Sequence, residues 1–323
     1  MRRKLFIAAA TALATAAALC AAPAGAADFP ARAVQMVVPF TPGGDTDHLG
    51  RMFAEKLASL WKQPVVVQNR PGAGASLGAA QVAAAPPDGY TLLMASAGMV
   101  MNPLLMKKLP YDPKALVPVA LVASGPNVLY VKSSLPVNSV QELVAWAKAN
   151  PGKLTFANSG NGTSTHLAAE LFAARAGIDM VNVPYKGAGP AQMDLVGQQV
   201  DAYFSVLNLM PYAKQGKVRA LAVASERRVA EAPELPTVDE SGIRGVYSGP
   251  WFGIYAPAGL PPAVMASIGD AVKAVADDPA MKKQIAHLPL TPDYRGTGEF
   301  TRFMQEETAR WSEVIRSHAI VVD

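Results

Sequence analysis

Two glycine-rich stretches in this sequence have residue types and spacing suited to binding an anion. The first is Thr41-Pro42-Gly43-Gly44-Asp45, and the second is Asn158-Ser159-Gly160-Asn161-Gly162. An apolar strand pattern precedes each stretch and a helical pattern follows it, so each is expected to lead into the N-terminus of a helix. The first amides of a helix lack partners within the helix and carry partial positive charge. Two such ends facing each other across a cleft would hold a small carboxylate, although ordinary strand-to-helix turns share this pattern.

Other chemistries fit the sequence less well. Residues 72–78 have the spacing G-x-G-x-x-x-G instead of the dinucleotide fingerprint G-x-G-x-x-G, and the sequence contains no P-loop pattern. It also has no G-x-S-x-G motif, and Ser159 would need a base that the sequence does not place beside it. His166, in a predicted helix, is more typical of a structural histidine than of a general base. We therefore predict neither a catalytic residue nor a cofactor.

The segment Asp45-Thr46-Asp47-His48 has two carboxylates and an imidazole, which are possible ligands of a metal ion. Because these residues begin a predicted helix, we favour a role in capping its free amides over metal binding. Several aromatic residues at predicted strand ends are candidates either for the wall of a cleft or for the core. They are Phe40, Tyr185, Tyr203, Tyr247 and Trp251.

The elements that must position these residues alternate between strand and helix. Strand-like runs occupy residues 34–40, 65–67, 90–94, 153–157, 181–184, 200–204, 220–223 and 250–256. Helical periodicity follows Asp47 and recurs over residues 77–85, 163–176, 262–276 and from about Thr297. This alternation predicts an α/β protein whose sheets are mostly parallel and flanked by helices.

The strand–loop–helix unit occurs twice, which predicts two similar lobes with a cleft between them. The mature sequence has no low-complexity linker, so we expect the chain to pass between the lobes more than once. The expected crossings lie near residues 123–125 and 247–249. The first lobe would then be discontinuous, with residues 27–124 and 250–323, and the second lobe would comprise residues 125–249.

The N-terminal residues 1–26 have the features of a secretory signal peptide. A cationic start at Arg2, Arg3 and Lys4 precedes an apolar stretch, and Ala24-Gly25-Ala26 supplies small residues for cleavage near Ala26. Removing this segment lowers the formal net charge from +4 to +1 and leaves no basic run for nucleic acid. It also removes Cys20, the single cysteine, so the mature protein needs no disulfide and suits the bacterial periplasm.

The composition excludes a disordered chain, because half of the residues are hydrophobic and 17% are charged. Beyond the N-terminal segment, no run of 18 apolar residues suggests a membrane span. We therefore expect a folded protein of two ordinary-sized lobes.

An ordered series of motifs resembles the Bug family, the substrate-binding proteins of tripartite tricarboxylate transporters. The series comprises residues 38–44 with Asp47 and Arg51, then residues 69–74, 87–93, 159–163 with His166, 183–187, 200–201, 219–223 and 235–238. Each motif alone is weakly specific, whereas their order along essentially the whole mature chain is highly specific.

The resemblance implies a two-lobed periplasmic binding protein fold, type II-like, that closes on its ligand. In this family, backbone amides and ordered waters at the two glycine loops hold a ligand carboxylate. Carried over by position, the implied ligand-binding residues are Phe40, Thr41, Gly43, Gly44, Asp47, Ser96, Ala97, Ser159, Gly160, Asn161, Gly162, Thr163, Tyr185, Lys186, Gly187 and Ser205. Many members have an acidic or amide residue where this chain has Ser205, so the ligand's identity stays open.

The function implied is that of a monomeric, non-enzymatic protein that captures a small organic carboxylate in the periplasm. It would deliver this ligand to the membrane permease of a tripartite tricarboxylate transporter, without nucleic acid or metal. Alternatives are the ligand-binding component of a periplasmic signalling pathway and, less favoured, a periplasmic hydrolase. The effector domain of a transcription regulator is disfavoured by the signal peptide. Aliphatic, aromatic and amino-acid ligands all remain open.

Overall fold

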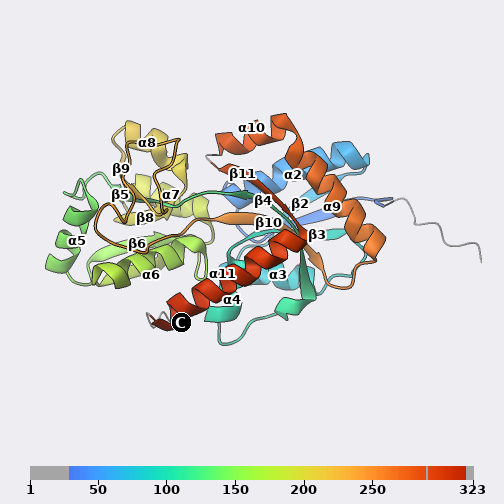
Figure 1. The fold of residues 1–323 in the computed structure, drawn as a ribbon, viewed down its shortest axis with the longest axis horizontal. Coiled ribbons are helices and arrows are strands. Elements are labelled where there is room, and N and C mark those ends of the chain that lie inside the picture. The colour runs from blue at the N-terminus through green and yellow to red at the C-terminus, as the bar shows by residue number, and fades with distance from the viewer. Residues whose placement is uncertain (1–28, 289, 318–323) are drawn as a thin grey trace, which may run out of the picture.

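The computed structural model describes residues 29–288 and 290–317, so the predicted signal peptide lies outside the described residues. Within this part of the chain the strands form two sheets, and each sheet with its helices makes one lobe (Figure 1). The first lobe contains both ends of the described chain, and the second lobe is formed by the middle of the sequence.

The first lobe is built on a six-stranded sheet with the order β11-β4-β10-β3-β1-β2. Its strands are β1 (Val34–Val38), β2 (Val65–Asn69), β3 (Thr91–Ser96), β4 (Leu116–Ser124), β10 (Trp251–Pro257) and β11 (Thr291–Gly296). Its helices are α2 (Asp45–Trp61), α3 (Ser76–Ala83), α4 (Gly98–Leu105), α9 (Pro262–Asp277), α10 (Pro279–His287) and α11 (Thr297–Ser317), with short 3₁₀ turns η1 (Ala73–Ala75) and η2 (Pro113–Ala115).

The second lobe is built on a five-stranded sheet with the order β7-β6-β8-β5-β9. Its strands are β5 (Val128–Lys132), β6 (Leu154–Asn158), β7 (Met180–Pro184), β8 (Ala202–Ser205) and β9 (Val218–Val223). Its helices are α5 (Val140–Ala149), α6 (Ser164–Ala176), α7 (Ala188–Val196) and α8 (Met210–Lys214), with the 3₁₀ turn η3 (Leu207–Leu209). Across the described parts of both lobes, no helix is both long and apolar enough to span a bilayer.

The two-lobed α/β fold is confirmed, but both sheets are mixed, whereas mostly parallel sheets were expected. In the first lobe β1 is parallel to β2 and β3, while β10 lies antiparallel between β3 and β4. In the second lobe β5 is antiparallel to both β8 and β9. The reason is topological: β10 enters the first sheet only after the chain has returned from the second lobe.

The core explains why the central strands are continuous apolar runs. Met36 and Leu92 pack with α2, α9 and α10 on one face of the first sheet. The alternate residues Val37 and Leu93 pack with α3, α4 and α11 on the other face. Strands covered by helices on both faces lose the apolar–polar alternation of a half-exposed sheet. This packing fixes the position of the N-terminus of α2.

Two chain segments connect the lobes and lie side by side. The Gly125 amide donates to Pro250 O at 3.0 Å, and the Asn127 amide donates to Ser248 O at 3.0 Å. Gly249 permits this approach, because a Cβ there would lie 2.0 Å from Gly125 O. The paired segments form a narrow connection about which the lobes can rotate.

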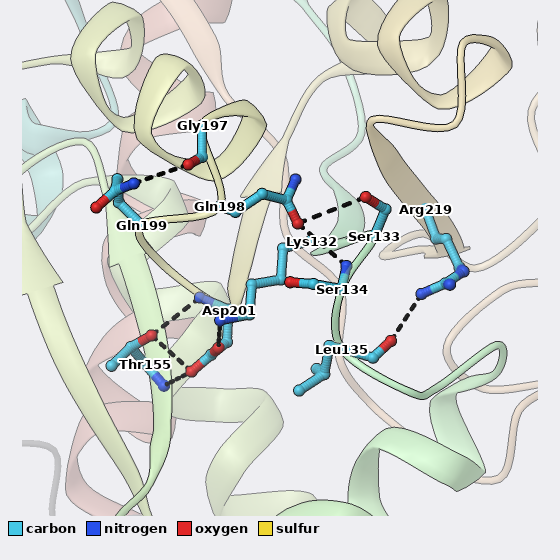
Figure 2. Close-up of polar contacts among 10 residues, drawn as sticks. All are labelled: Lys132, Ser133, Ser134, Leu135, Thr155, Gly197, Gln198, Gln199, Asp201 and Arg219. Atoms are coloured by element: carbon cyan, nitrogen blue, oxygen red, sulfur yellow. Dashed lines mark hydrogen bonds and ion pairs between the residues drawn. The ribbon is translucent and has the colours of Figure 1, made fainter.

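The second sheet is held at one end by a partly buried ion pair (Figure 2). Lys132 Nζ lies 2.6 Å from Asp201 Oδ1, and the Thr155 amide and hydroxyl donate to Asp201 Oδ2 at 2.8 and 2.7 Å. Burial raises the pKa of Asp201, but the bonds from Lys132 and Thr155 outweigh burial and hold this pKa below its ordinary value. The cluster therefore ties β5 and β6 to the start of β8.

We expect Asp201→Asn to lower the free energy of unfolding by about 3 kcal/mol, because it leaves the Lys132 ammonium without its carboxylate. Lys132→Met should cost less, since Asp201 keeps its bonds from Thr155. Urea unfolding at pH 7 measures both effects. Equal losses in the two variants, or no loss in Asp201→Asn, would contradict this account.

Candidate functional site

A small cavity of about 40 Å³ lies where the two lobes meet. From the first lobe it is lined by Phe40, Gly44, Asp45, Thr46, Ser96, Pro250 and Phe252. From the second lobe and the connection it is lined by Asn127, Ser159, Thr163, Ser164, Thr165, Ala188, Tyr203, Ser205 and Val206. A cavity of this size has room for roughly three water-sized groups, so a larger ligand requires the lobes to move apart.

The N-termini of α2, α6 and α7 converge on this cavity. Gly44 precedes α2, and within the described residues no side chain caps that helix. The capping role expected for the acidic residues at this helix start is therefore wrong, since Asp47 accepts from the Gly43 amide before the helix. Ala188, the first residue of α7, lies close enough to Gly44 that a Cβ on Gly44 would be 3.7 Å from the Ala188 amide nitrogen. The α6 end is capped by Thr163, whose hydroxyl accepts from the His166 amide at 3.4 Å. Convergent helix N-termini create a positive potential without any cationic side chain.

The structure has the lobes in contact around the cavity. The Thr41 amide and hydroxyl both donate to Lys186 O, at 3.2 and 3.1 Å. Gly74 faces Asn161 across the cleft so closely that a Cβ on Gly74 would lie 2.0 Å from Asn161 O. These contacts describe a closed arrangement in which the first glycine loop faces Lys186 and the second glycine loop faces Gly74.

Asp47 holds the first loop in shape. Its carboxylate accepts from the Gly43 amide at 3.0 Å, from Arg51 Nε at 3.0 Å and from Asn69 Nδ2 at 2.8 Å. Burial raises the pKa of Asp47, but these hydrogen bonds and the Arg51 charge outweigh it and hold the pKa below its ordinary value. Asp47 therefore acts on the loop and does not line the cavity.

The second loop is held by its own hydroxyl groups. The Ser159 amide donates to Thr165 Oγ1 at 2.9 Å, and the Thr163 hydroxyl donates to Gly160 O at 2.7 Å. The Ser159 hydroxyl lies 2.6 Å from the Tyr203 hydroxyl. His166 Nδ1 instead accepts from the Gly162 amide at 3.3 Å. Ser159 and His166 thus have separate partners and do not form a nucleophile–base pair.

A second, larger cavity of about 480 Å³ lies on the other side of the second loop. It is lined from the first lobe by Ala73, Gly74, Asn102, Leu105, Met106, Lys107 and Lys108, and from the second by Gly160, Asn161, Gly162, Pro184, Tyr185 and Lys186. The three lysines give this side of the cleft a positive charge. The second loop therefore separates a small inner cavity from a wider basic one.

The structure distributes the implied ligand-binding residues over both cavities. Those at the inner cavity are Phe40, Gly44, Ser96, Ser159, Thr163 and Ser205. Those at the outer cavity are Gly160, Asn161, Gly162, Tyr185 and Lys186. The remaining five line neither: Thr41 contacts Lys186, Gly43 contacts Asp47, Ala97 is buried at the start of α4, and Gly187 precedes α7.

Sequence reasoning missed several cavity residues. Asp45 was taken only as a helix cap or metal ligand, and Ala188 lies in a Gly- and Pro-containing segment that does not look helical. Asn127 lies in a connection with no motif of its own. Of the aromatic candidates, Tyr203 lines the inner cavity, whereas the Trp251 ring packs against Phe300 and Phe303.

Residues 49–320 match the family model described as the tripartite tricarboxylate transporter family receptor. The chain belongs to this family. Protein BugT of Bordetella pertussis is 37% identical over 300 residues, which is 92% of each chain. The solved periplasmic binding protein BugD has a TM-score of 0.85 and 34% identity, and the match covers 91% of this chain and 99% of BugD.

A Rhodopseudomonas palustris protein of known structure, solved with adipate, is also similar to this receptor. Its TM-score is 0.86 at 33% identity, over 91% of this chain and 99% of that protein. Members of the receptor family are periplasmic binding proteins, and the two-lobed fold agrees with this membership. The expected family is confirmed.

We expect Asp47→Asn to destabilise the receptor by about 1–3 kcal/mol at pH 7, because the loop loses a charged acceptor for three donors. Since the pKa of Asp47 is lowered in the folded state, its stabilisation is present above about pH 4 and is lost as pH falls through the folded pKa. The stability difference between wild type and variant should therefore shrink in acid.

Urea unfolding of both proteins between pH 3 and pH 7 measures this difference. Asp270→Asn is the matched control, because Asp270 is an exposed aspartate on α9 of the same lobe. A difference for Asp47→Asn that stays constant across this pH range would contradict the role given to the ionised carboxylate.

Proposed function

We propose that this receptor captures a small organic carboxylate between its lobes and delivers it to the permease of a tripartite transporter. The observation that carries the proposal is the convergence of the N-termini of α2, α6 and α7 on one small cavity between the lobes. Backbone amides at these ends match the geometry and charge of a carboxylate. A similar protein was solved with adipate, which supports an organic acid as the ligand.

The proposal assigns binding to both glycine loops. Phe40, Gly44, Ser96, Ser159 and Thr163 would surround the carboxylate, and Ser205 would face the rest of the ligand. Residues at the outer cavity, including Tyr185 and Lys186, would form the mouth of the closed cleft. Thr41 and Gly187 would help to close it, since Thr41 donates to Lys186 O beside Gly187.

Binding without turnover is part of the proposal. The Ser159 hydroxyl pairs with Tyr203, and His166 accepts from the Gly162 amide, so neither is arranged to activate a nucleophile. In the described part of the chain, no group of three or more His, Cys, Asp and Glu residues could hold a metal ion. These observations favour a receptor over a hydrolase.

The proposal also covers the cellular location of the protein and the hinge between its two lobes. The signal peptide would direct export, and cleavage near Ala26 would release the mature protein into the periplasm. Lobe boundaries near residues 124 and 250 would make the paired segments 125–127 and 248–250 the hinge. Rotation about this hinge would bury the ligand and change the surface presented to the permease.

We expect a thermal-shift screen of the refolded protein to give stabilisation by small organic acids and not by their isosteric amides. Refolding removes any ligand carried through purification. An acid at 100 times its Kd should add about 2.7 kcal/mol of stability, which raises Tm by several degrees. Equal stabilisation by acids and their amides would contradict the anion site, and chemical conversion of a bound acid would contradict a receptor.

We expect Gly74→Ala to abolish most of the ligand-induced shift, because the added Cβ would meet Asn161 O and hold the lobes apart. Gly177→Ala is the matched control. Both glycines have φ near +60°, so both variants pay the strain of a left-handed alanine, but nothing lies within 4 Å of a Cβ on Gly177. Only the Gly74 variant should lose affinity, by tenfold or more in titration calorimetry. Similar affinities in the two variants would show that closure does not govern binding.

A further inference from the structure

The inner cavity has a carboxylate of its own. Asp45 is the first residue of α2, is half-buried and lines the cavity. Its Oδ1 accepts from Asn208 Nδ2 at 3.5 Å, the outer limit for a hydrogen bond. Asp47, two residues later, instead accepts from three donors at 2.8–3.0 Å. Asp45 therefore retains most of its hydrogen-bonding capacity.

The contact with Asn208 is the last of a series across the second lobe. Gln192 Nε2 donates to Ser205 Oγ at 3.2 Å, and Ser205 Oγ donates to Asn208 Oδ1 at 3.2 Å. Asn208 then donates to Asp45 on the other lobe. The series orients Asp45 and Ser205 within one polar wall.

The charge of Asp45 is uncompensated by the cavity's side chains. Among the described residues that line the cavity, none is Lys, Arg or His. Asn208 contacts Asp45 from η3, and Tyr203, Ser164 and Thr165 line the same cavity from β8 and the α6 end. Asp47, on the same helix as Asp45, is paired with Arg51. Burial raises the pKa of Asp45 to about 7. Even a partly buried carboxylate without a cation is unfavourable unless a bound group compensates it.

A second acceptor lines the same cavity. Asn127 is fully buried, and its Nδ2 donates to Ser248 Oγ at 3.2 Å. Within the described structure its Oδ1 has no hydrogen-bond partner. A buried amide oxygen of this kind needs a donor. The cavity thus combines donor backbone amides at helix ends with two acceptor side chains.

We propose that the ligand of this receptor carries a protonated amine as well as a carboxylate, and that Asp45 is the residue that recognises the amine. The inference rests on the proposed function, because the helix N-termini hold the carboxylate. The amine then donates to Asp45 and neutralises it. Asn127 Oδ1 is the second acceptor available to the amine.

A dicarboxylate with the same chain length as the amino acid requires a different protonation state of Asp45. Its second carboxylate would approach a like charge, so Asp45 would have to take up a proton to bind it. An amine requires the opposite, an ionised Asp45. Free amino acids keep both charges between about pH 5.5 and 8.5. A short dicarboxylate begins to take up a proton of its own near pH 5.5, because its two carboxylates repel each other, so its pH dependence is read only between about pH 6.5 and 8.5. The pH dependence of affinity therefore has opposite signs for the two ligand classes.

The test is titration calorimetry of the refolded protein with unbranched C3–C6 amino acids, both α- and ω-amino, and with the dicarboxylates and monocarboxylates of equal length. We expect at least one amino acid to bind tenfold or more tightly than its matched dicarboxylate at pH 7.5. Its affinity should weaken as pH falls to 5.5, because Asp45 takes up a proton.

Asp45→Asn keeps the side chain's shape and removes its charge. This variant should bind the amino acid at least tenfold more weakly than the wild type does. Its affinity for the matched monocarboxylate should stay within about threefold of the wild-type value, and the pH dependence of amino-acid binding should disappear. Asp270→Asn, which removes an exposed charge from the same lobe, should leave all affinities unchanged.

Two results would overturn the proposal in distinguishable ways. If dicarboxylates bind most tightly and gain affinity as pH falls, the proposed receptor function is supported but the amine proposal is wrong. Protonated Asp45 would then recognise the second carboxylate of the ligand. If no acid in the series binds, the carboxylate receptor itself is wrong, and the role of Asp45 is wrong with it.

Discussion

The partial positive charge at the N-termini of α2, α6 and α7 is the interaction on which the rest of this structure depends. These ends meet at one small cavity, and the described residues that line it include no basic side chain. Two lobes that bring like partial charges together need an anion between them, or an internal substitute. Asp45 supplies part of that compensation when the cleft is closed, which makes its carboxylate the most informative group in the site.

Closure has a second requirement, the close approach of backbone to backbone. At the connection, Gly249 allows contact with Gly125, and at the cleft, Gly74 allows contact with Asn161. A side chain at either position would collide with a carbonyl oxygen. Backbone contacts of this kind leave little freedom in how the lobes meet, so the helix ends are brought to the same cavity each time the cleft closes.

The sequence predicted many, but not all, of the elements whose patterns are local: β4, β5 and α5 were not predicted, although the apolar runs of both strands and the Ser139 cap of α5 are local signals. The strand–loop–helix units around β1–α2 and β6–α6 could be recognised because an apolar run, glycines and a helical period follow one another directly. The helix α7 could not, because Gly189 and Pro190 in its first turn resemble a loop. Likewise β11 was missed, since Thr291–Gly296 is largely polar and lies at a sheet edge. The antiparallel entry of β10 depends on the chain's return from the second lobe, which no local pattern contains.

The residues of the candidate site also divide into those that the sequence could predict and those that it could not. An anion site made of backbone amides can be predicted from glycine-rich loops, because it requires only a suitable turn followed by a helix. The residues that choose among ligands carry no motif: Asp45 is two positions from the better-recognised Asp47, and Asn127 and Asn208 come from segments joined only by folding. An anion-binding site made of main-chain amides accepts any small carboxylate. Under the proposed function, specificity comes from the side chains of the remaining wall, where a charge with no cationic side chain beside it outweighs several neutral contacts because partial burial removes much of its water. By this argument, the proposed receptor would depend on Asp45 more than on Ser205 for its choice of ligand, although Ser205 is the position at which the sequence departs from the family pattern.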